Sequence, residues 1–472
     1  MSLKNMSEDE CTPPKCPRQD DSSYKMEASS LEEIARVAAP RKRVLEACIN
    51  GLTKCIAQGC ARKVINQLPC NGRYSSRNPV RVTILTDTCG WTWDNSLAKE
   101  LSKQLAKFPL VKVSVLVPEG LRNEMPRDAE NDKVTIVEAK KQPGFQDPNE
   151  WQYFPPKDLT TDIVIGVGER LCRMAQIFKE YHHCKSIFVG WDSFEESLCR
   201  ERKLRNALVA IESEILRGES NLRPLMEMAD LPVAKGPTMA DKLSRSLSYQ
   251  EKMVFEFTPG ILGEFANIRQ NTHDRKKFCI LVAGHDHPKY FEKEGLKIVA
   301  KAVAELRDGS YKIIFVGAGG QENVKKFEEE FLKWGVLKHQ LSIRSPPKDE
   351  EELKSWLCEA DLAIVPSGGQ EFGMFGLAAL SSGLPILVHG ASGLGEALTD
   401  VINGSSSIVE SEDISVWSKA IKRVRDRNRR KRLEEADLLR KHYSEKYSWE
   451  EQCGALVEEM LKMASAQQDK TQ

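Results

Sequence analysis

The fold is decided by residues 366–388, which read PSGGQEFGMFGLAALSSGLPILV. An apolar run from Leu362 to Val365 precedes them and predicts a buried strand, and the glycine-rich segment leads into a predicted helix that ends at Gly383. A strand, a glycine-rich loop and a helix start together place backbone N–H groups and the positive end of a helix dipole where a phosphate can bind. The stretch therefore predicts a phosphate-binding turn in an α/β protein.

The composition narrows the class of the protein and its partners. With 472 residues, 40% of them hydrophobic, the chain can form two globular domains with sizeable cores. Lysine plus arginine and aspartate plus glutamate both number 69, so no overall field attracts nucleic acid or an anionic membrane. The 13 cysteines form no CxxC pair, and neither a secretory signal nor a run of 18 apolar residues is found. We expect a cytoplasmic protein with free thiols and without a nucleic-acid or membrane partner.

The first 77 residues differ from the rest of the chain. Residues 1–29 are polar and predict a disordered tail. Residues 30–77 predict a helical segment followed by a linker, because Ser30 and Glu33 form a capping-box pattern and apolar residues recur at helical spacing. The helical part, residues 30–67, is a candidate site for a protein partner.

Two series of short apolar runs, alternating with helical patterns, follow in residues 78–262 and 276–440. The predicted strands are 80–85, 111–117, 134–137, 162–166 and 186–189 in the first series and 279–284, 311–317, 341–344, 362–365 and 385–388 in the second. Alternation of this kind predicts parallel sheets that helices cover on both faces. We expect an α/β fold of two Rossmann-like, doubly wound domains facing a cleft, with a C-terminal helix at 441–465 and a tail at 466–472.

Several short motifs resemble, in the same order, those of the family 4 glycosyltransferases. They are Thr258-Pro259-Gly260, Phe315 to Ala318, Ala360 to Ser367, Gly383-Leu384-Pro385 and Tyr447-Ser448-Trp449. The resemblance is continuous from about Phe255 to Met460, and the chain looks closest to animal proteins in which a degenerate or divergent transferase module is joined to signalling domains. It implies a GT-B fold and a retaining transferase that uses a nucleotide-sugar, without a metal or another cofactor.

The resemblance also implies a pair of cations for the diphosphate of the donor, which this chain lacks. In the family an arginine follows the first strand of the second half and a lysine lies a few residues later; here His285 and Glu294 stand at these positions. Glu294 would repel a diphosphate, and each lost cationic contact is worth about 3–4 kcal/mol of transition-state stabilisation. Three lysines lie close enough in sequence to substitute if they point toward Gly373: Lys289, Lys293 and Lys297.

Two glutamates that the family carries in the donor loop are replaced as well. Anchoring the comparison on Phe372-Gly373 places Gln370 at the first glutamate and Ala378 at the second. Gln370 can still hydrogen-bond a sugar, whereas Ala378 offers no polar side-chain contact to a ribose. Recruiting Glu371 instead needs a one-residue slip that would turn the buried helix face. The remaining candidates for donor binding are Gln370, Phe372, Gly373, Met374 and Phe375.

Residues that the family carries near the donor are also replaced in the first half of the chain. A histidine that lies near the reacting sugar in the family is matched by Trp191, and the glycine pair after the first strand is matched by residues 87–94, DTCGWTWD. One glycine remains there and two tryptophans have entered. Trp91 and Trp93 are equally suited to stack on a sugar or base and to anchor the core.

Some of these residues also have purely structural interpretations. Gly373 and Gly376 can serve helix-to-strand packing, although the neighbouring motifs favour the donor loop. His285 and His287 without a third ligand are more often loop residues than metal ligands, so we predict no metal. The basic run at 422–432 is followed on the same predicted helix by acidic residues and predicts a solvated helix face rather than a nucleic-acid site.

Two functions from different classes follow from the sequence. The first is a degenerate, non-catalytic module that retains the transferase fold for binding or scaffolding, with a sugar or a nucleotide-sugar as a possible ligand. The second is an active retaining glycosyltransferase that moves a hexose from a nucleotide-sugar with a rewired donor site. The loss of both cations favours the first.

Overall fold

The computed structural model describes residues 78–86, 93–120, 133–190, 222–250, 252–368 and 372–468. The predicted N-terminal tail, helical segment and linker lie outside these residues, and so do Trp91, Trp191 and Gln370. Within the described ranges, no helix combines the length and the apolar character needed to cross a lipid bilayer.

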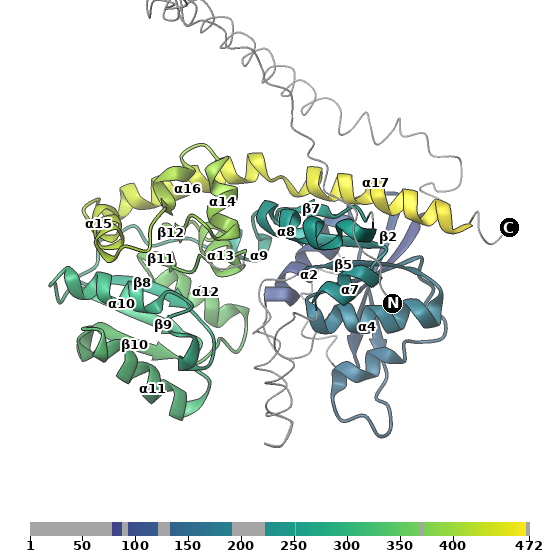
Figure 1. Ribbon diagram of the computed structural model, residues 1–472, viewed down its shortest axis with the longest axis horizontal. Helices are drawn as coiled ribbons and strands as arrows, with labels where there is room; N and C mark the ends of the chain where they lie inside the picture. The colour runs from purple at the N-terminus through teal and green to yellow at the C-terminus, as the bar shows by residue number, and fades with distance from the viewer. Residues whose placement is uncertain are drawn as a thin grey trace, which may run out of the picture. The chain divides into compact units, whose positions relative to one another are not determined.

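The first half of the described chain is a parallel sheet with helices between its strands (Figure 1). The strands are β1 (Val80–Leu85), β2 (Val111–Pro118), β3 (Thr135–Ala139), β4 (Ile163–Val167), β5 (Lys185–Val189), β6 (Leu231–Lys235) and β7 (Phe255–Phe257). The helices are α2 (Trp93–Leu105), η2 (Pro148–Tyr153), α4 (Glu169–His182), α7 (Leu222–Met228), α8 (Pro237–Leu247) and η3 (Ser248–Gln250). The strands are ordered β3-β2-β1-β4-β5-β6-β7, so the direction of winding reverses between β1 and β4.

The second half repeats this architecture. Its strands are β8 (Phe278–Ala283), β9 (Tyr311–Val316), β10 (Leu341–Arg344), β11 (Leu362–Val365), β12 (Ile386–His389) and β13 (Ile408–Val409), in the sheet order β10-β9-β8-β11-β12-β13. Its helices are α9 (Gly263–Ala266), η4 (Pro288–Tyr290), α10 (Leu296–Glu305), α11 (Gly320–Lys333), η5 (Lys338–Gln340), α12 (Glu350–Glu359), α13 (Met374–Ser381), α14 (Gly393–Thr399), η6 (Gly404–Ser407), α15 (Ile414–Arg425), α16 (Arg429–Lys446) and α17 (Trp449–Gln468). All its strand pairs are parallel, so both sheets confirm the predicted pair of Rossmann-like domains.

An aromatic core fixes the strands that carry the candidate site. Side chains of β8 and β9 pack against α10, α11 and α15 in one buried cluster. In this cluster the rings of Phe315 and Phe327 have centroids 4.5 Å apart, and those of Phe291 and Phe331 meet edge to face at 4.8 Å. Such ring pairs stabilise the fold beyond the area they bury. The carboxyl ends of β8 and β9 are therefore held on a rigid base.

Two of the family-like motifs contact each other. The segment after β7 contains Gly260, where a Cβ atom would lie 2.7 Å from the carbonyl oxygen of Tyr447 and 2.8 Å from the Trp449 ring. The indole N–H of Trp449 donates to the carbonyl of Ile261 at 2.7 Å. Glycine at this position and tryptophan at the start of α17 are thus explained by one close packing contact.

The strands predicted from sequence agree with the structure to within two residues, but β6, β7 and β13 were not predicted. In β6 (LPVAK), Pro232 and Lys235 interrupt the apolar pattern, although the structure buries Lys235. Only two residues form β13, which is too short for a periodic signal. The helix expected at 441–465 is divided in the structure: α16 ends at Lys446, and α17 begins at Trp449 and ends at Gln468.

The interpretation of residues 422–432 as one solvated helix face is wrong. The run spans the end of α15 and the start of α16, because the Asn428 side chain accepts the N–H of Lys431 at 2.9 Å and caps a new helix. Arg429 and Arg432 are buried. Sequence reasoning places arginine at the surface unless a buried partner is known, and here that partner is Asp361, far away in the sequence.

Candidate functional site

The candidate site lies at the carboxyl ends of β8 and β11. These strands are neighbours in the sheet, but the chain leaves β8 toward β9 on one side and leaves β11 toward β12 on the other. Ligands of open α/β sheets bind at such a topological switch point. Residues 284–295 follow β8, and the described residues 366–368 and 372–376 follow β11. We call these two segments the switch-point site.

Glycine allows the two segments to approach each other. A Cβ atom on Gly295 would lie 2.7 Å from the carbonyl oxygen of Pro366, and Gly295 has a φ of 71°. Both the space and the left-handed backbone therefore require glycine at this position. The contact places the turn after β8 directly against the loop after β11.

Glu294 binds the turn after β8 with its own carboxylate. Its Oε1 and Oε2 atoms accept the backbone N–H of His285 at 2.9 and 3.1 Å, and Oε1 also contacts Nδ1 of the His285 ring. The side chains of His285 and Glu294 are only 12% and 14% exposed, so water screens them weakly. A protein carboxylate thus holds a backbone N–H at the place where this fold commonly presents N–H groups to a phosphate.

The His285 ring has one nitrogen left over. Its Nε2 atom is buried and makes no hydrogen bond to any described residue. The ring lies beside Tyr290, with centroids 5.1 Å apart. A buried imidazole nitrogen without a partner is costly unless a ligand or a water satisfies it. His285 is therefore placed to hydrogen-bond a ligand at the switch point.

Two nearby lysines contact aromatic rings. The Lys297 ammonium pairs with Glu292 at 3.0 Å and lies 4.3 Å from the centroid of the Trp334 ring. The Lys289 ammonium lies 4.4 Å from the centroid of the Tyr290 ring. The Lys297 contacts are not with the loop that contains Gly373, so the geometry does not support substitution of the missing cations by Lys297.

The loop after β11 enters α13 through buried residues. The side chains of Phe372, Met374 and Phe375 are all buried, and a Cβ atom on Gly236 would lie 3.1 Å from the Phe372 ring. Gly373 precedes α13 with a φ of 88°, a conformation that favours glycine. These three side chains belong to the core, so the turn presents the N-terminal end of α13 rather than their side chains.

Packing explains Gly376 and Ala378 in helix α13. Ala378 is fully buried on a helix whose side chains are buried on every face. A Cβ atom on Gly376 would lie 2.8 Å from both Leu394 and Val365, so helix-to-strand packing explains this glycine. Gln370, with Glu371, lies outside the described residues.

His389 was missed by the sequence reasoning. It ends β12, the strand beside β11, and its buried ring accepts the N–H of Ala391 on Nδ1 at 3.1 Å. A Cβ atom on Gly368 would lie 2.8 Å from this ring, so His389 borders the loop after β11. Its Nε2 atom is buried and has no hydrogen-bond partner among the described residues. The signal was a histidine at the end of an apolar run, which sequence alone could have indicated.

The first half has a second switch point, between β1 and β4. The turn after β1 and Trp191 fall outside the described residues, and nothing is described of the Trp93 side chain. After β4 the chain turns at Gly168, whose φ is 81°, into α4. In the described part of the chain no group of three or more histidine, cysteine or acidic side chains is placed to hold a metal ion.

Comparisons with known proteins agree with this architecture. A family model described as family 4 glycosyltransferase in conflict systems matches residues 95–456, more than half of the chain. A D-inositol 3-phosphate glycosyltransferase from Corynebacterium diphtheriae is 26% identical over 214 residues, covering 43% of this chain and 49% of that protein. A protein of the same name from Streptosporangium roseum is 32% identical over 269 residues, covering 51% and 60%. The chain thus spans about half the length of the curated relatives it matches.

Solved structures show the same fold at low sequence identity. Sucrose-phosphate synthase from Thermosynechococcus elongatus superposes with a TM-score of 0.56 at 13% identity, covering 82% of this chain and all of that one. HepE from Anabaena, in complex with UDP and glucose, superposes with a TM-score of 0.55 at 13% identity, covering 81% and 99%. At this identity the likeness is one of fold.

Proposed function

The chain belongs to the family 4 glycosyltransferases, and we propose that it is a non-catalytic member that binds a sugar without transferring one. The observation that carries this proposal is the Glu294 carboxylate bound to the His285 backbone N–H. The carboxylate supplies, from within the chain, the negative charge that the diphosphate of a donor would bring. A nucleoside diphosphate would have to displace Glu294 or lie against it.

Repulsion by the Glu294 carboxylate disfavours a diphosphate at the turn after β8. Two like charges about 5 Å apart repel by about 3 kcal/mol at an effective dielectric constant of 20. Catalysis needs positive charge beside the diphosphate, since a glycosyl transfer develops negative charge on this leaving group. The turn that should stabilise this charge carries an anion, and Lys297 pairs with Glu292 instead. Transfer from a nucleotide-sugar is therefore disfavoured in both the ground and the transition state.

Neutral hydroxyl groups suit the same site better. Two buried ring nitrogens have no hydrogen-bond partner among the described residues. One is Nε2 of His285, which follows β8, and the other is Nε2 of His389, the last residue of β12. In the neutral rings, Nε2 of His285 is an acceptor because Nδ1 donates to the Glu294 carboxylate, and Nε2 of His389 is a donor because Nδ1 accepts the N–H of Ala391. A sugar hydroxyl can match either one. A site with buried polar groups selects ligands that satisfy them, because an unmatched group costs binding energy. We therefore assign a sugar as the ligand class.

The alternative is an active retaining hexosyltransferase with a rewired donor site. The similarity to HepE in complex with UDP and glucose favours it, as far as the fold goes. In that alternative, the N-terminal end of α13 at Gly373 and the amide of Gln370 would hold the donor. Ala378 counts against it, because it offers no polar contact at the ribose position that the family resemblance implies.

The rest of the chain contributes expectations that bear on the setting. Three expectations remain parts of the proposal. The chain is cytoplasmic, it comes from an animal protein in which the transferase module is joined to signalling domains, and residues 30–67 bind a protein partner. The composition of the chain supports the first, and the helical pattern of residues 30–67 supports the last.

The test compares sugar binding with turnover in the purified full chain. Glucose and mannose are titrated calorimetrically into the wild type, His285→Gln, His389→Gln and a control, His339→Gln, at an exposed histidine. In parallel, release of nucleoside diphosphate is followed with UDP-, GDP- and ADP-sugars. We expect sugar binding that the first two variants weaken and the control leaves unchanged, with no nucleotide release. Enzyme-dependent nucleotide release would overturn the non-catalytic assignment, and equal sugar affinity in all variants would overturn the site.

A further inference from the structure

A cavity opens in the second half of the chain, away from the switch-point site. It has a volume of about 330 Å³, and residues 274–278, Asp361 and residues 425–428 line it together with Arg432. Residues 274–277 and Asp361 directly precede β8 and β11, so the cavity lies at the amino ends of the strands whose carboxyl ends carry the switch-point site. At about 3.3 Å per residue, the length of these strands separates the two sites by roughly 13–20 Å. The two sites are therefore distinct.

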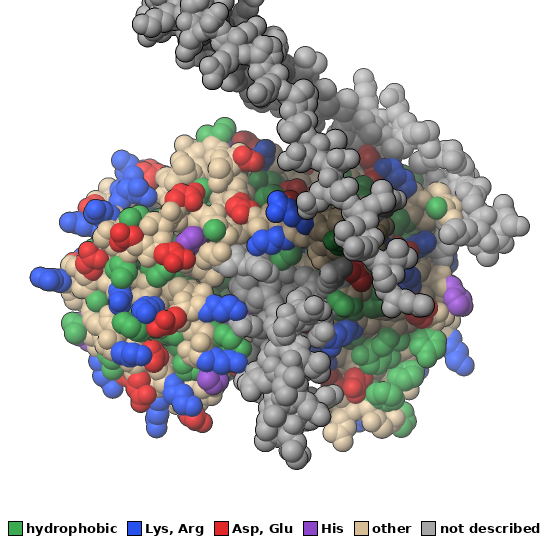
Figure 2. Space-filling view, viewed as in Figure 1, with side chains coloured by type: hydrophobic (Ala, Val, Ile, Leu, Met, Phe, Trp, Pro, Cys, Tyr) green, Lys and Arg blue, Asp and Glu red, His purple; other side chains and the backbone are tan. Residues whose placement is uncertain are grey.

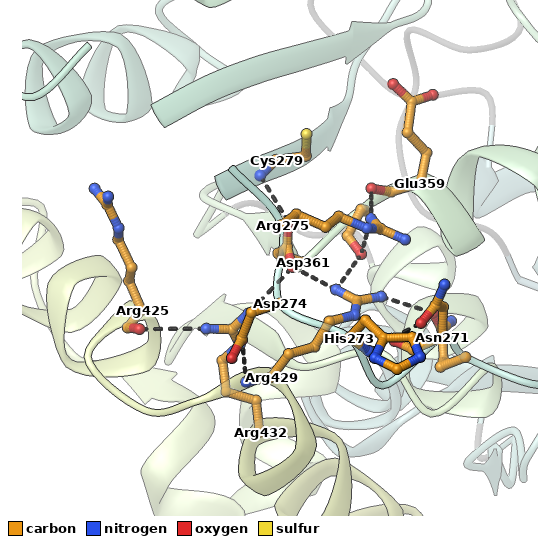
Figure 3. Close-up of polar contacts among 12 residues, drawn as sticks. Asn271, His273, Asp274, Arg275, Cys279, Glu359, Asp361, Arg425, Arg429 and Arg432 are labelled. Carbon is orange, nitrogen blue, oxygen red and sulfur yellow. Dashed lines mark hydrogen bonds and ion pairs between the residues drawn. The ribbon is translucent and has the colours of Figure 1, made fainter. Parts of the chain in front are cut away.

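A buried charge cluster forms the inner wall of this cavity. The guanidinium groups of Arg429 and Arg432 converge on Asp361 (Figure 3), where both contact Oδ1, Arg432 at 3.1 Å. The other carboxylate oxygen of Asp361 accepts the backbone N–H of Cys279 at 2.9 Å. All three charged side chains are buried. The Asp274 carboxylate also lies at this cluster and accepts the Arg429 backbone N–H at 2.8 Å, and the Arg275 guanidinium adds a third cation. Two carboxylates therefore face three guanidinium groups, and the remaining positive charge is costly unless a further anion is near.

Arg432 has an N–H group to spare. Its Nη1 group donates to the carbonyls of Arg425 and Arg427, and its Nη2 group donates to Asp361. The Nε atom is buried and has no hydrogen-bond partner among the described residues. The side chain is only 6% exposed, so bulk water does not readily supply one. A buried cationic donor without a partner points to an acceptor that the protein itself does not supply.

The helix that starts at this cavity has an inverted charge pattern. The first turn of α16 is Arg429-Arg430-Lys431-Arg432, and its cap, Asn428, lines the cavity. The N-terminal end of a helix carries a partial positive charge and is normally matched with acidic residues. Four cationic residues at this end repel the dipole. An anion in the cavity would be attracted by both the dipole and the arginines.

The lining as a whole is basic. Its charged members are six cations, Arg275, Lys276, Lys277, Arg425, Arg427 and Arg432, and three carboxylates, Asp274, Asp361 and Asp426. Two of the cations also pair with carboxylates outside the lining, Arg425 with Asp308 and Arg427 with Glu435. On the face shown in Figure 2, by contrast, lysine and arginine side chains alternate with acidic ones. Lys276 and Lys277 are exposed, and their ammonium groups have no ion pair or hydrogen bond with described residues. They remain available to a ligand.

We propose that this cavity, the amino-end site, binds a small phosphate-bearing anion, such as a phosphomonoester or a diphosphate. The excess of cations favours an anionic ligand, and the volume fits a small molecule rather than an extended polymer. Arginine N–H groups and a helix start match the several acceptor oxygens of a phosphate. The proposal does not depend on the switch-point site.

The test uses inorganic pyrophosphate as the probe and the full chain as the receptor. Calorimetric titrations compare the wild type with Lys276→Ala/Lys277→Ala, which removes two exposed lysines and spares the buried cluster. Lys325→Ala/Lys348→Ala is the matched control, since both of its lysines are exposed and neither lines the cavity. We expect wild-type binding that the first variant weakens about tenfold and the control leaves within about twofold, because hydrogen bonds to charged groups carry much of such affinity.

Two results would overturn the proposal. The first is no pyrophosphate binding to the wild type, or equal binding in the two double variants, since pyrophosphate held at the switch-point site would not respond to Lys276 and Lys277. The second is equal affinity for sulfate at the same ionic strength, which would reduce the site to unspecific attraction of anions. At least tenfold weaker sulfate binding is expected.

Discussion

Replacing Glu294 with glutamine should turn the switch-point site from one that repels a diphosphate into one that tolerates it. In the wild type, Glu294 accepts the His285 backbone N–H with both carboxylate oxygens, at 2.9 and 3.1 Å. Glutamine has nearly the same shape and keeps one oxygen that can accept this N–H. The substitution therefore removes the charge while the turn after β8 is retained.

The size of the effect follows from the distance between the charges. A phosphate near the His285 N–H would lie about 5 Å from the carboxylate, where the repulsion is about 3 kcal/mol at an effective dielectric constant of 20. This corresponds to a change in affinity of up to about 150-fold. Because a bound phosphate is partly screened by water and salt, we expect UDP to bind Glu294→Gln about 10 to 100 times more tightly than the wild type.

The assay is calorimetric titration of UDP into the wild type, Glu294→Gln and Glu292→Gln at fixed salt. Glu292 is the matched control because its side chain is 62% exposed and pairs with Lys297 rather than with the turn. We expect its affinity for UDP to stay within about twofold of the wild type. Equal UDP binding by Glu294→Gln and the wild type would refute the idea that Glu294 excludes the diphosphate, and so would an equal gain in Glu292→Gln.

Three further predictions concern stability. In Gly295→Ala the new Cβ atom would lie 2.7 Å from the Pro366 carbonyl oxygen at a φ of 71°, whereas in Gly120→Ala, at a φ of 89°, it would lie in open space. Urea unfolding should therefore show Gly295→Ala to be about 1–3 kcal/mol more destabilising than Gly120→Ala. Equal losses of unfolding free energy would contradict the close-packing argument. Asp361→Ala leaves Arg429 buried and unpaired and should cost about 3–5 kcal/mol of unfolding free energy, so a loss below about 1 kcal/mol would contradict the buried-cluster account. Burial raises the pKa of Glu264 from 4.5 to about 7, so the folded chain holds a proton in this window that the unfolded chain has released. The unfolding free energy should fall as pH rises from about 4.5 to 7, and Glu264→Gln should flatten this fall between pH 5 and 8; an unchanged slope would contradict the assignment.

Much of the fold could be predicted because its signals are local. In the second half, β8 and β11 are continuous apolar runs and β9 is one apart from Lys312, which is typical of a parallel sheet that is buried on both faces. The glycine-rich loop before α13 could be predicted for the same reason, since Gly373 needs a positive φ that other residues rarely adopt. β6 was missed because Pro232 and Lys235 obscure its pattern, and only the packing around the strand explains why Lys235 is buried.

The site could be predicted only in part, because its decisive contacts join residues that local patterns do not connect. The sequence indicated that Glu294 would repel a diphosphate, but not that its carboxylate would bind the His285 N–H. Burial of Arg429 depends on Asp361, 68 residues earlier in the chain, and no periodicity signals such a pair. For the same reason the amino-end site was invisible in sequence, where its cations are divided between residues 275–277 and 425–432.

The most direct test of the central claim is the turnover of nucleotide-sugars by the wild-type chain. The purified chain would be incubated with UDP-, GDP- and ADP-linked glucose and mannose, and released nucleoside diphosphate would be measured against a blank without protein. The proposed loss of catalysis predicts release at the rate of the blank for every donor. Release that exceeds the blank in proportion to protein concentration would contradict it and would establish the chain as an active transferase.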